Sequence, residues 1–219
     1  MFVALCPHPP LLVPRLDPHD LPELVAVRAA AREVVADLLR SEPDVVTVLA
    51  AGTEQIDHDE LAGGTLDGHG VTASAGGRHQ VLPLSATIGA WLLDDAGWRG
   101  RRRYVDASAD AALEEAEALL VMADGTACRT ERAPGYLDER AEGFDADVAA
   151  ALASGDTKAL AMLDLSLAAE LAMGGGPVLV ALGEQVQARR ERGADVVARL
   201  RHESAPLGVG YWVADWQVG

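Results

Sequence analysis

The chain has 219 residues, of which 49% are hydrophobic and 24% are charged, and its formal net charge is −16. This length and composition predict one folded domain with a substantial core, because the chain is too apolar to be disordered and too interrupted by charges to be a membrane protein. An acidic surface repels phosphate backbones and anionic lipids, so we expect neither a nucleic acid nor a membrane as a partner.

The chain is predicted to open with a β-α-β unit. The apolar run 2–5 predicts a strand that Pro7 must end, since proline donates no ladder hydrogen bond. Apolar residues at helical spacing predict a helix over about 21–39, and the β-branched run 45–49 predicts a strand buried on both faces. Such units build parallel sheets. We therefore expect a three-layer α/β fold, in which a mostly parallel or mixed sheet has helices on both faces.

The rest of the chain adds further helices and strands without a recognisable boundary. Residues 61–77 are rich in glycine and follow no regular pattern. In chain order, the patterns then predict a helix over 84–93, a strand over 103–105, a helix over 109–118, a strand over 119–122, helices over 143–153, 157–163, 167–171 and 177–189, and a strand over 208–216. With no internal repeat and no long linker, the sequence predicts a single domain over 1–219.

Cysteine usage and the first residues bear on the location of the protein. Cys6 and Cys128 are too few for a disulfide framework, and we expect both to be buried thiols. The first ten residues contain neither the basic stretch nor the small-residue cleavage site of a secretion signal. We therefore expect a cytoplasmic location.

Two features of the sequence suggest surface segments. Arg99 and residues 101–103 form a basic cluster, which is more typical of a solvated loop than of a binding patch. Trp212 and Trp216 lie in the last predicted strand, where exposed tryptophans would contribute to a homodimer interface, although tryptophan is at least as often a core residue.

Candidate functional residues follow the predicted strands, because ligands in open α/β sheets bind beyond the carboxyl ends of strands. His8 follows the first strand between prolines that restrict its backbone. This arrangement fits a metal ligand or a general base, and it also fits a histidine that only hydrogen-bonds a neighbouring loop. Thr53, Asp124 and Cys128 follow later strands. The run 174–176 precedes a helix and is either an anion site or a tight connection.

Several segments resemble one family. The sequence PHPPLLVP at 7–14 resembles the opening of the class III extradiol ring-cleavage dioxygenase superfamily, to which protocatechuate dioxygenase catalytic subunits and Memo-like proteins belong. Residues 124–129, the loop with Tyr136, and PLGVGY at 206–211 are similar to later segments of that family. The resemblance spans the chain and implies an extradiol-dioxygenase-like fold with a small-molecule crevice at the strand carboxyl ends.

The resemblance also implies a metal site, of which this chain keeps little. Family enzymes hold Fe(II) with two histidines and a carboxylate, and a further histidine acts as acid and base. His8 matches the first histidine ligand, whereas residues 51–53 stand where the second is expected. Cys128 takes the place of the acid/base histidine, and residues 172–173 that of the carboxylate or of the cysteine of Memo-like proteins. A degenerate metal site is therefore predicted, and ordinary Fe(II) ring cleavage is not expected.

Three functions remain open on the sequence. The first is a pseudoenzyme-like relative that keeps the crevice and binds a small molecule without a cofactor. The second is a metal-dependent oxidoreductase with a rearranged site for Fe(II) or zinc. His8 with Cys6 or Cys128, and with Asp124 or His58, would make a site better suited to zinc or copper. The third is a non-catalytic, Memo-like interaction protein. The candidate catalytic residues are His8, Asp124 and Cys128, and the candidate substrate-binding residues are Thr53, Arg129, Tyr136, Met173 and Gly174.

Overall fold

The computed structural model describes residues 1–52 and 55–219, and it has the predicted three-layer α/β architecture. The strands are β1 (Phe2–Cys6), β2 (Val45–Ala50), β3 (Asp57–His58), β4 (Ala62–Thr65), β5 (Ser74–Gly76), β6 (His79–Gln80), β7 (Arg101–Val105), β8 (Ala118–Met122), β9 (Val196–Ser204) and β10 (Tyr211–Val218). The α-helices are α1 (Pro22–Leu39), α2 (Leu84–Asp95), α3 (Asp110–Glu115), α4 (Arg140–Ser154), α5 (Thr157–Ala161), α6 (Leu165–Glu170) and α7 (Gly176–Glu191). Short 3-10 turns are η1 (Pro10–Leu12), η2 (Pro14–Leu16), η3 (Asp67–His69) and η4 (Pro206–Gly208).

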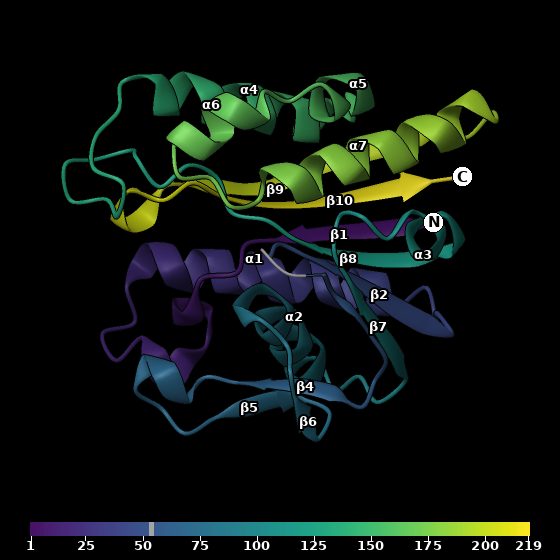
Figure 1. Ribbon diagram of the computed structural model, residues 1–219, viewed down its shortest axis with the longest axis horizontal. Helices are drawn as coiled ribbons and strands as arrows, with labels where there is room; N and C mark the ends of the chain where they lie inside the picture. Colours follow the sequence, from purple (N-terminus) through teal and green to yellow (C-terminus); the bar gives the residue numbers. More distant parts are fainter. Residues whose placement is uncertain (53–54) are drawn as a thin grey trace.

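A seven-stranded mixed sheet with the order β3-β7-β2-β8-β1-β10-β9 forms the middle layer (Figure 1). β7, β2, β8 and β1 run parallel to one another, whereas β10 is antiparallel to β1, β9 to β10 and β3 to β7. The carboxyl ends of the four parallel strands therefore meet at one edge of the sheet. The chain leaves β2 toward α2 on one face and leaves β8 toward α4 on the other, so a topological switch point lies between these two neighbouring strands.

Both faces of the large sheet are buried against helices. Leu120 and Met122 of β8 belong to the core cluster that includes α1 and α2, and the alternating Leu119 and Val121 belong to the cluster that includes α4 and α7. Each such fully buried aliphatic side chain stabilises the fold by roughly 1.5–3 kcal/mol. The alternation explains why the inner strands read as continuous apolar runs in the sequence.

The glycine-rich segment and one strand differ from the sequence predictions. Residues 61–77, for which no pattern was found, contribute to a second sheet with the order β5-β4-β6. This sheet packs against α2 and is drawn below that helix in Figure 1. In this sheet β4 tolerates no side chain at Gly63, because a Cβ there would lie 2.0 Å from the carbonyl oxygen of Gly77. β9 was not predicted either, since as an edge strand it alternates half-buried and exposed residues.

The two predicted surface features are wrong. Trp212 and Trp216 are each only 1% exposed, and the indole Nε1 of Trp216 donates to the carbonyl of Leu152 at 2.9 Å. Both tryptophans belong to the core and give no dimer surface. The basic cluster at 101–103 is strand β7 rather than a loop, and the guanidinium of Arg102 is buried. None of the described helices is long and apolar enough to span a membrane.

Candidate functional site

His8 and Asp124 meet at the carboxyl edge of the sheet, where the adjacent strands β1 and β8 end. The backbone amide of His8 donates to Oδ1 of Asp124 at 2.6 Å, and the imidazole Nδ1 of His8 lies 3.5 Å from the same oxygen. This Nδ1 is buried and accepts or donates no hydrogen bond within the described residues. The strand order therefore brings together two of the predicted residues that are 116 positions apart in the chain.

The Asp124 side chain is largely buried, with 17% exposure. Burial raises the pKa of its carboxyl group, and the opposing effects of the His8 side chain and of the His8 amide do not cancel this shift. Burial, with the nearby charge of Asp124, also raises the pKa of the Tyr211 hydroxyl. Gly175 packs directly on this strand end, because a Cβ there would lie 2.6 Å from the carbonyl oxygen of Asp124. The His8–Asp124 pair thus lies next to the segment that leads into α7.

A pocket of about 420 Å³ opens at the same edge, beyond the ends of β2 and β7. Its described lining consists of Ala50 at the end of β2, residues 51–52 and Gln55 after β2, residues 106–108 after β7, and Gly174, Pro177 and Val178 at the start of α7. We call it the β2–β7 pocket. Gly174 faces open space among the described residues, since a Cβ added there would meet none of their atoms within 4 Å. The volume lies within the range of small-molecule sites, toward its lower end.

Asp106 provides the fixed polar group of this pocket. Its carboxylate accepts hydrogen bonds from the amide of Ile56, from the amide of Ser108 at 2.7 Å and from the Ser108 hydroxyl at 2.6 Å. Burial acts to raise the pKa of Asp106, but these hydrogen bonds outweigh it and the pKa lies below its ordinary value. The carboxylate is therefore ionised at neutral pH. The sequence pattern did not indicate residues 106–108 as site residues, although they follow a predicted strand.

Arg129 is bound within the fold, because it pairs with the buried Asp145 of α4. Nη1 of Arg129 lies 3.1 Å from Oδ2 of Asp145, which is 1% exposed, and Nη2 lies 3.4 Å from Glu142. The Asp145 carboxylate also accepts from the amide and the hydroxyl of Thr126, each at 2.9 Å. Asp145 thereby ties α4 to the loop after β8. The sequence does indicate that Asp145 is buried, since this aspartate lies within the apolar stripe of an amphipathic helix.

A pH dependence of stability follows from Asp145. Burial raises the pKa of its carboxyl group above the ordinary 3.8, despite the bonds from Thr126 and Arg129. The native protein thus holds this proton more tightly than the unfolded chain, and the stability contributed by the group falls as the pH rises from about 3.8 through the native pKa. We expect Asp145→Asn to remove this decline. Urea unfolding of both proteins across this range would show it, and parallel pH profiles would contradict it.

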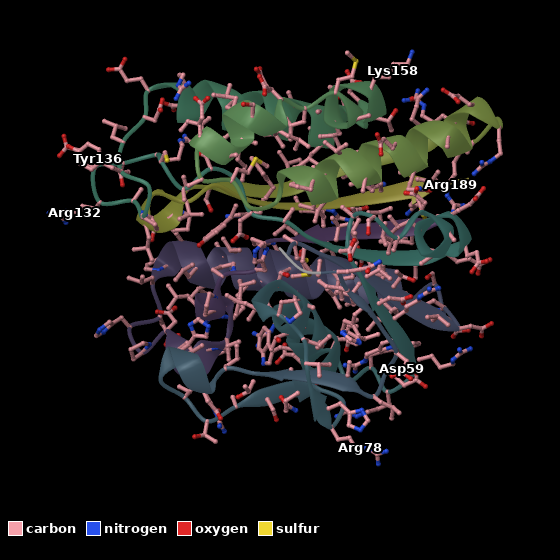
Figure 2. The ribbon with its side chains drawn as sticks, viewed as in Figure 1. Asp59, Arg78, Arg132, Tyr136, Lys158 and Arg189 are labelled. Atoms are coloured by element: carbon pink, nitrogen blue, oxygen red, sulfur yellow. The ribbon has the colours of Figure 1, made fainter. Side chains whose placement is uncertain are left out.

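Cys128, Tyr136 and Met173 were also predicted as site residues. Cys128 is 2% exposed, and its thiol donates to the carbonyl of Gly135 at 3.5 Å. Burial and then the charges of nearby carboxylates raise its pKa, which keeps the thiol protonated and weakly nucleophilic. Tyr136 projects into solvent with 62% exposure (Figure 2), and Met173 is buried in the core. Thr53 lies outside the described residues. Cys6 and Cys128 are both buried, as predicted.

The described donor set does not fit the iron site that the resemblance implies. Fe(II) in such enzymes needs two imidazoles and a carboxylate that converge on one point. Across residues 1–52 and 55–219, no three side chains of histidine, cysteine, aspartate or glutamate are placed to hold a metal ion. His8 and Asp124 are the pair that meets, while Cys128 faces Gly135.

Fold and site together define a three-layer α/β protein with a pocket and a histidine–carboxylate pair at the carboxyl edge of its parallel strands. The sequence matches no protein-family model, and no curated protein matches it. The likeness to the extradiol dioxygenase superfamily therefore stays a prediction.

Proposed function

We propose that this protein binds a small molecule in the β2–β7 pocket. The observation that carries the proposal is the position of the pocket, which lies at the carboxyl edge of the parallel strands and is bordered by the start of α7. Ligands of open α/β proteins bind at this edge because loops from several strands converge there. Apolar walls from 50–51, Ala107 and Val178 with a few fixed polar groups are typical of such sites.

In this proposal the protein is an extradiol-dioxygenase-like relative that has kept the crevice and does not perform ordinary Fe(II) ring cleavage. The motif at 7–14 supports the relationship, and the donor set around His8 supports the lack of iron chemistry. The ligand is then held by the pocket itself, without a metal. The cytoplasm is the proposed location, because two buried free thiols suit a reducing compartment.

Filling the pocket tests the proposal. Gly174→Leu places a side chain into open space and requires no left-handed backbone, so we expect the variant to fold with nearly unchanged stability. Its side chain would occupy the volume that a ligand needs. A fragment library screened by ¹H–¹⁵N chemical shifts should therefore give binders that move the amides of Ser108 and Gly52 in the wild-type protein and lose at least about tenfold in affinity in the variant.

Gly143→Leu is the matched control, because Gly143 also faces open space but lies on the exposed surface of α4. The control variant should bind every fragment as the wild-type protein does. Fragments that bind the Gly174→Leu variant unchanged, or that move amides only outside the pocket, would show that the β2–β7 pocket is not the ligand site.

A further inference from the structure

One charged side chain lines the described part of the β2–β7 pocket. Asp106 is the one charged residue among the described residues that line the pocket, and no lysine, arginine or histidine lies among them. No described cation forms a salt bridge with Asp106, whose bonds come from two backbone amides and one hydroxyl. The negative charge of this wall is thus not neutralised by a side chain of the protein.

One acceptor position of Asp106 remains for a ligand. A carboxylate offers about four lone-pair positions. Oδ1 accepts from both the amide and the hydroxyl of Ser108, and Oδ2 accepts from the amide of Ile56. The loop therefore holds the carboxylate in place, and the described residues leave one acceptor position on Oδ2 open.

The start of α7 offsets this charge only in part. An uncapped helix N-terminus acts as roughly half a positive charge, whereas an ionised carboxylate carries a full negative one. No described side chain caps α7, so its first amides contribute this partial charge at the part of the pocket wall near Pro177. The sum is negative, and the formal net charge of −16 adds to it. A carboxylate or phosphate ligand would meet an unfavourable potential here.

We propose that the β2–β7 pocket takes a primary amine on a compact apolar body, with the ammonium group against Asp106 and the body against Ala107 and Val178. This inference rests on the proposed function and specifies its ligand class. An ammonium group is a compact point charge with three donors, which suits a single open acceptor position on a carboxylate. The alanine, valine and proline walls contact the apolar part.

Three probes with the same ring separate charge from shape, namely benzylamine, benzyl alcohol and benzoate. In titrations followed by the amide shifts of Ser108 and Gly174, we expect benzylamine to bind most tightly and benzoate most weakly. Asp106→Asn should weaken benzylamine about tenfold and leave benzyl alcohol nearly unchanged, because the amide keeps the shape and an acceptor but loses the charge. Raised salt should also weaken benzylamine binding to the wild-type protein, and this measurement needs no variant.

Asp110→Asn is the matched control, since Asp110 is exposed at the start of α3 and does not line the pocket. It removes the same charge from the chain and should leave benzylamine binding almost unchanged. Tighter binding of benzoate, or an equal effect of the two substitutions, would overturn the assignment of an amine while leaving the pocket as a ligand site. If none of the three probes moves the Ser108 and Gly174 amides, the assignment of an amine fails, and the fragment screen with Gly174→Leu decides the proposed function separately.

Discussion

Asp145→Ala is expected to lower the free energy of unfolding by about 3 kcal/mol. The substitution removes the acceptor of two hydrogen bonds from Thr126 and the partner of Arg129, whose side chain is 20% exposed. Breaking a buried pair leaves the remaining donors desolvated and unpaired, which costs more than the pair itself contributes. Urea denaturation at neutral pH, with the midpoint and the slope both fitted, measures the loss.

Asp147→Ala on the same helix provides the comparison for Asp145. Asp147 is exposed and forms no salt bridge or side-chain hydrogen bond with the described residues, so its replacement should change the free energy of unfolding by less than about 0.5 kcal/mol. Equal losses in the two variants would mean that helix propensity, rather than the bonds from Thr126 and Arg129, determines the effect.

The elements that the sequence predicted best are those whose residues are buried on a regular period. The helix over 21–39 and the strand 45–49 agree with α1 and β2 to within a residue at each end. Each turn of α1 places apolar residues in the core, and nearly every residue of β2 is buried. The small sheet was not predicted because its strands make close backbone contacts, as at Gly63, and therefore show no periodic pattern of apolar side chains. β9 escaped because an edge strand presents only one face to the protein.

The candidate site was predictable where strand order decides the geometry. His8 and Asp124 follow two buried strands, and parallel pairing of β1 with β8 brings them together. Cys128 follows the same strand, yet the chain turns back after it, and the amide of Gly135 bonds the carbonyl of Ala127 at 2.8 Å. Such a loop path depends on contacts between distant segments, which strand and helix periodicity do not encode. Residues 106–108 were missed for a different reason, since β7 carries three arginines and gave only a weak strand pattern.

The second large effect is expected from Asp94→Ala, with a loss of about 3 kcal/mol in the free energy of unfolding. Oδ1 of Asp94 lies 2.7 Å from Nη2 of Arg102, whose side chain is 6% exposed, and Oδ2 accepts from the amide of Gly76 at 2.8 Å. The substitution leaves a buried guanidinium without its carboxylate and frees the edge of β5. Unfolding in urea should show the loss, and hydrogen exchange at the Gly76 amide should become faster than in the wild-type protein.

The neighbouring Asp95 separates the buried pair from an ordinary surface pair. Its Oδ2 lies 2.7 Å from Nε of Arg32, the same distance as in the Asp94 pair, but the Arg32 side chain is 48% exposed. Because water screens an exposed ion pair and solvates each partner when the other is removed, Asp95→Ala should cost less than about 1 kcal/mol. The two aspartates are adjacent and lie at the same distance from their arginines. The difference between the stability losses of the two variants would therefore measure how much burial of the arginine adds to the loss. If the two variants lose equal stability, Arg102 finds another partner when Asp94 is removed, and the small sheet is held mainly by its apolar contacts with α2.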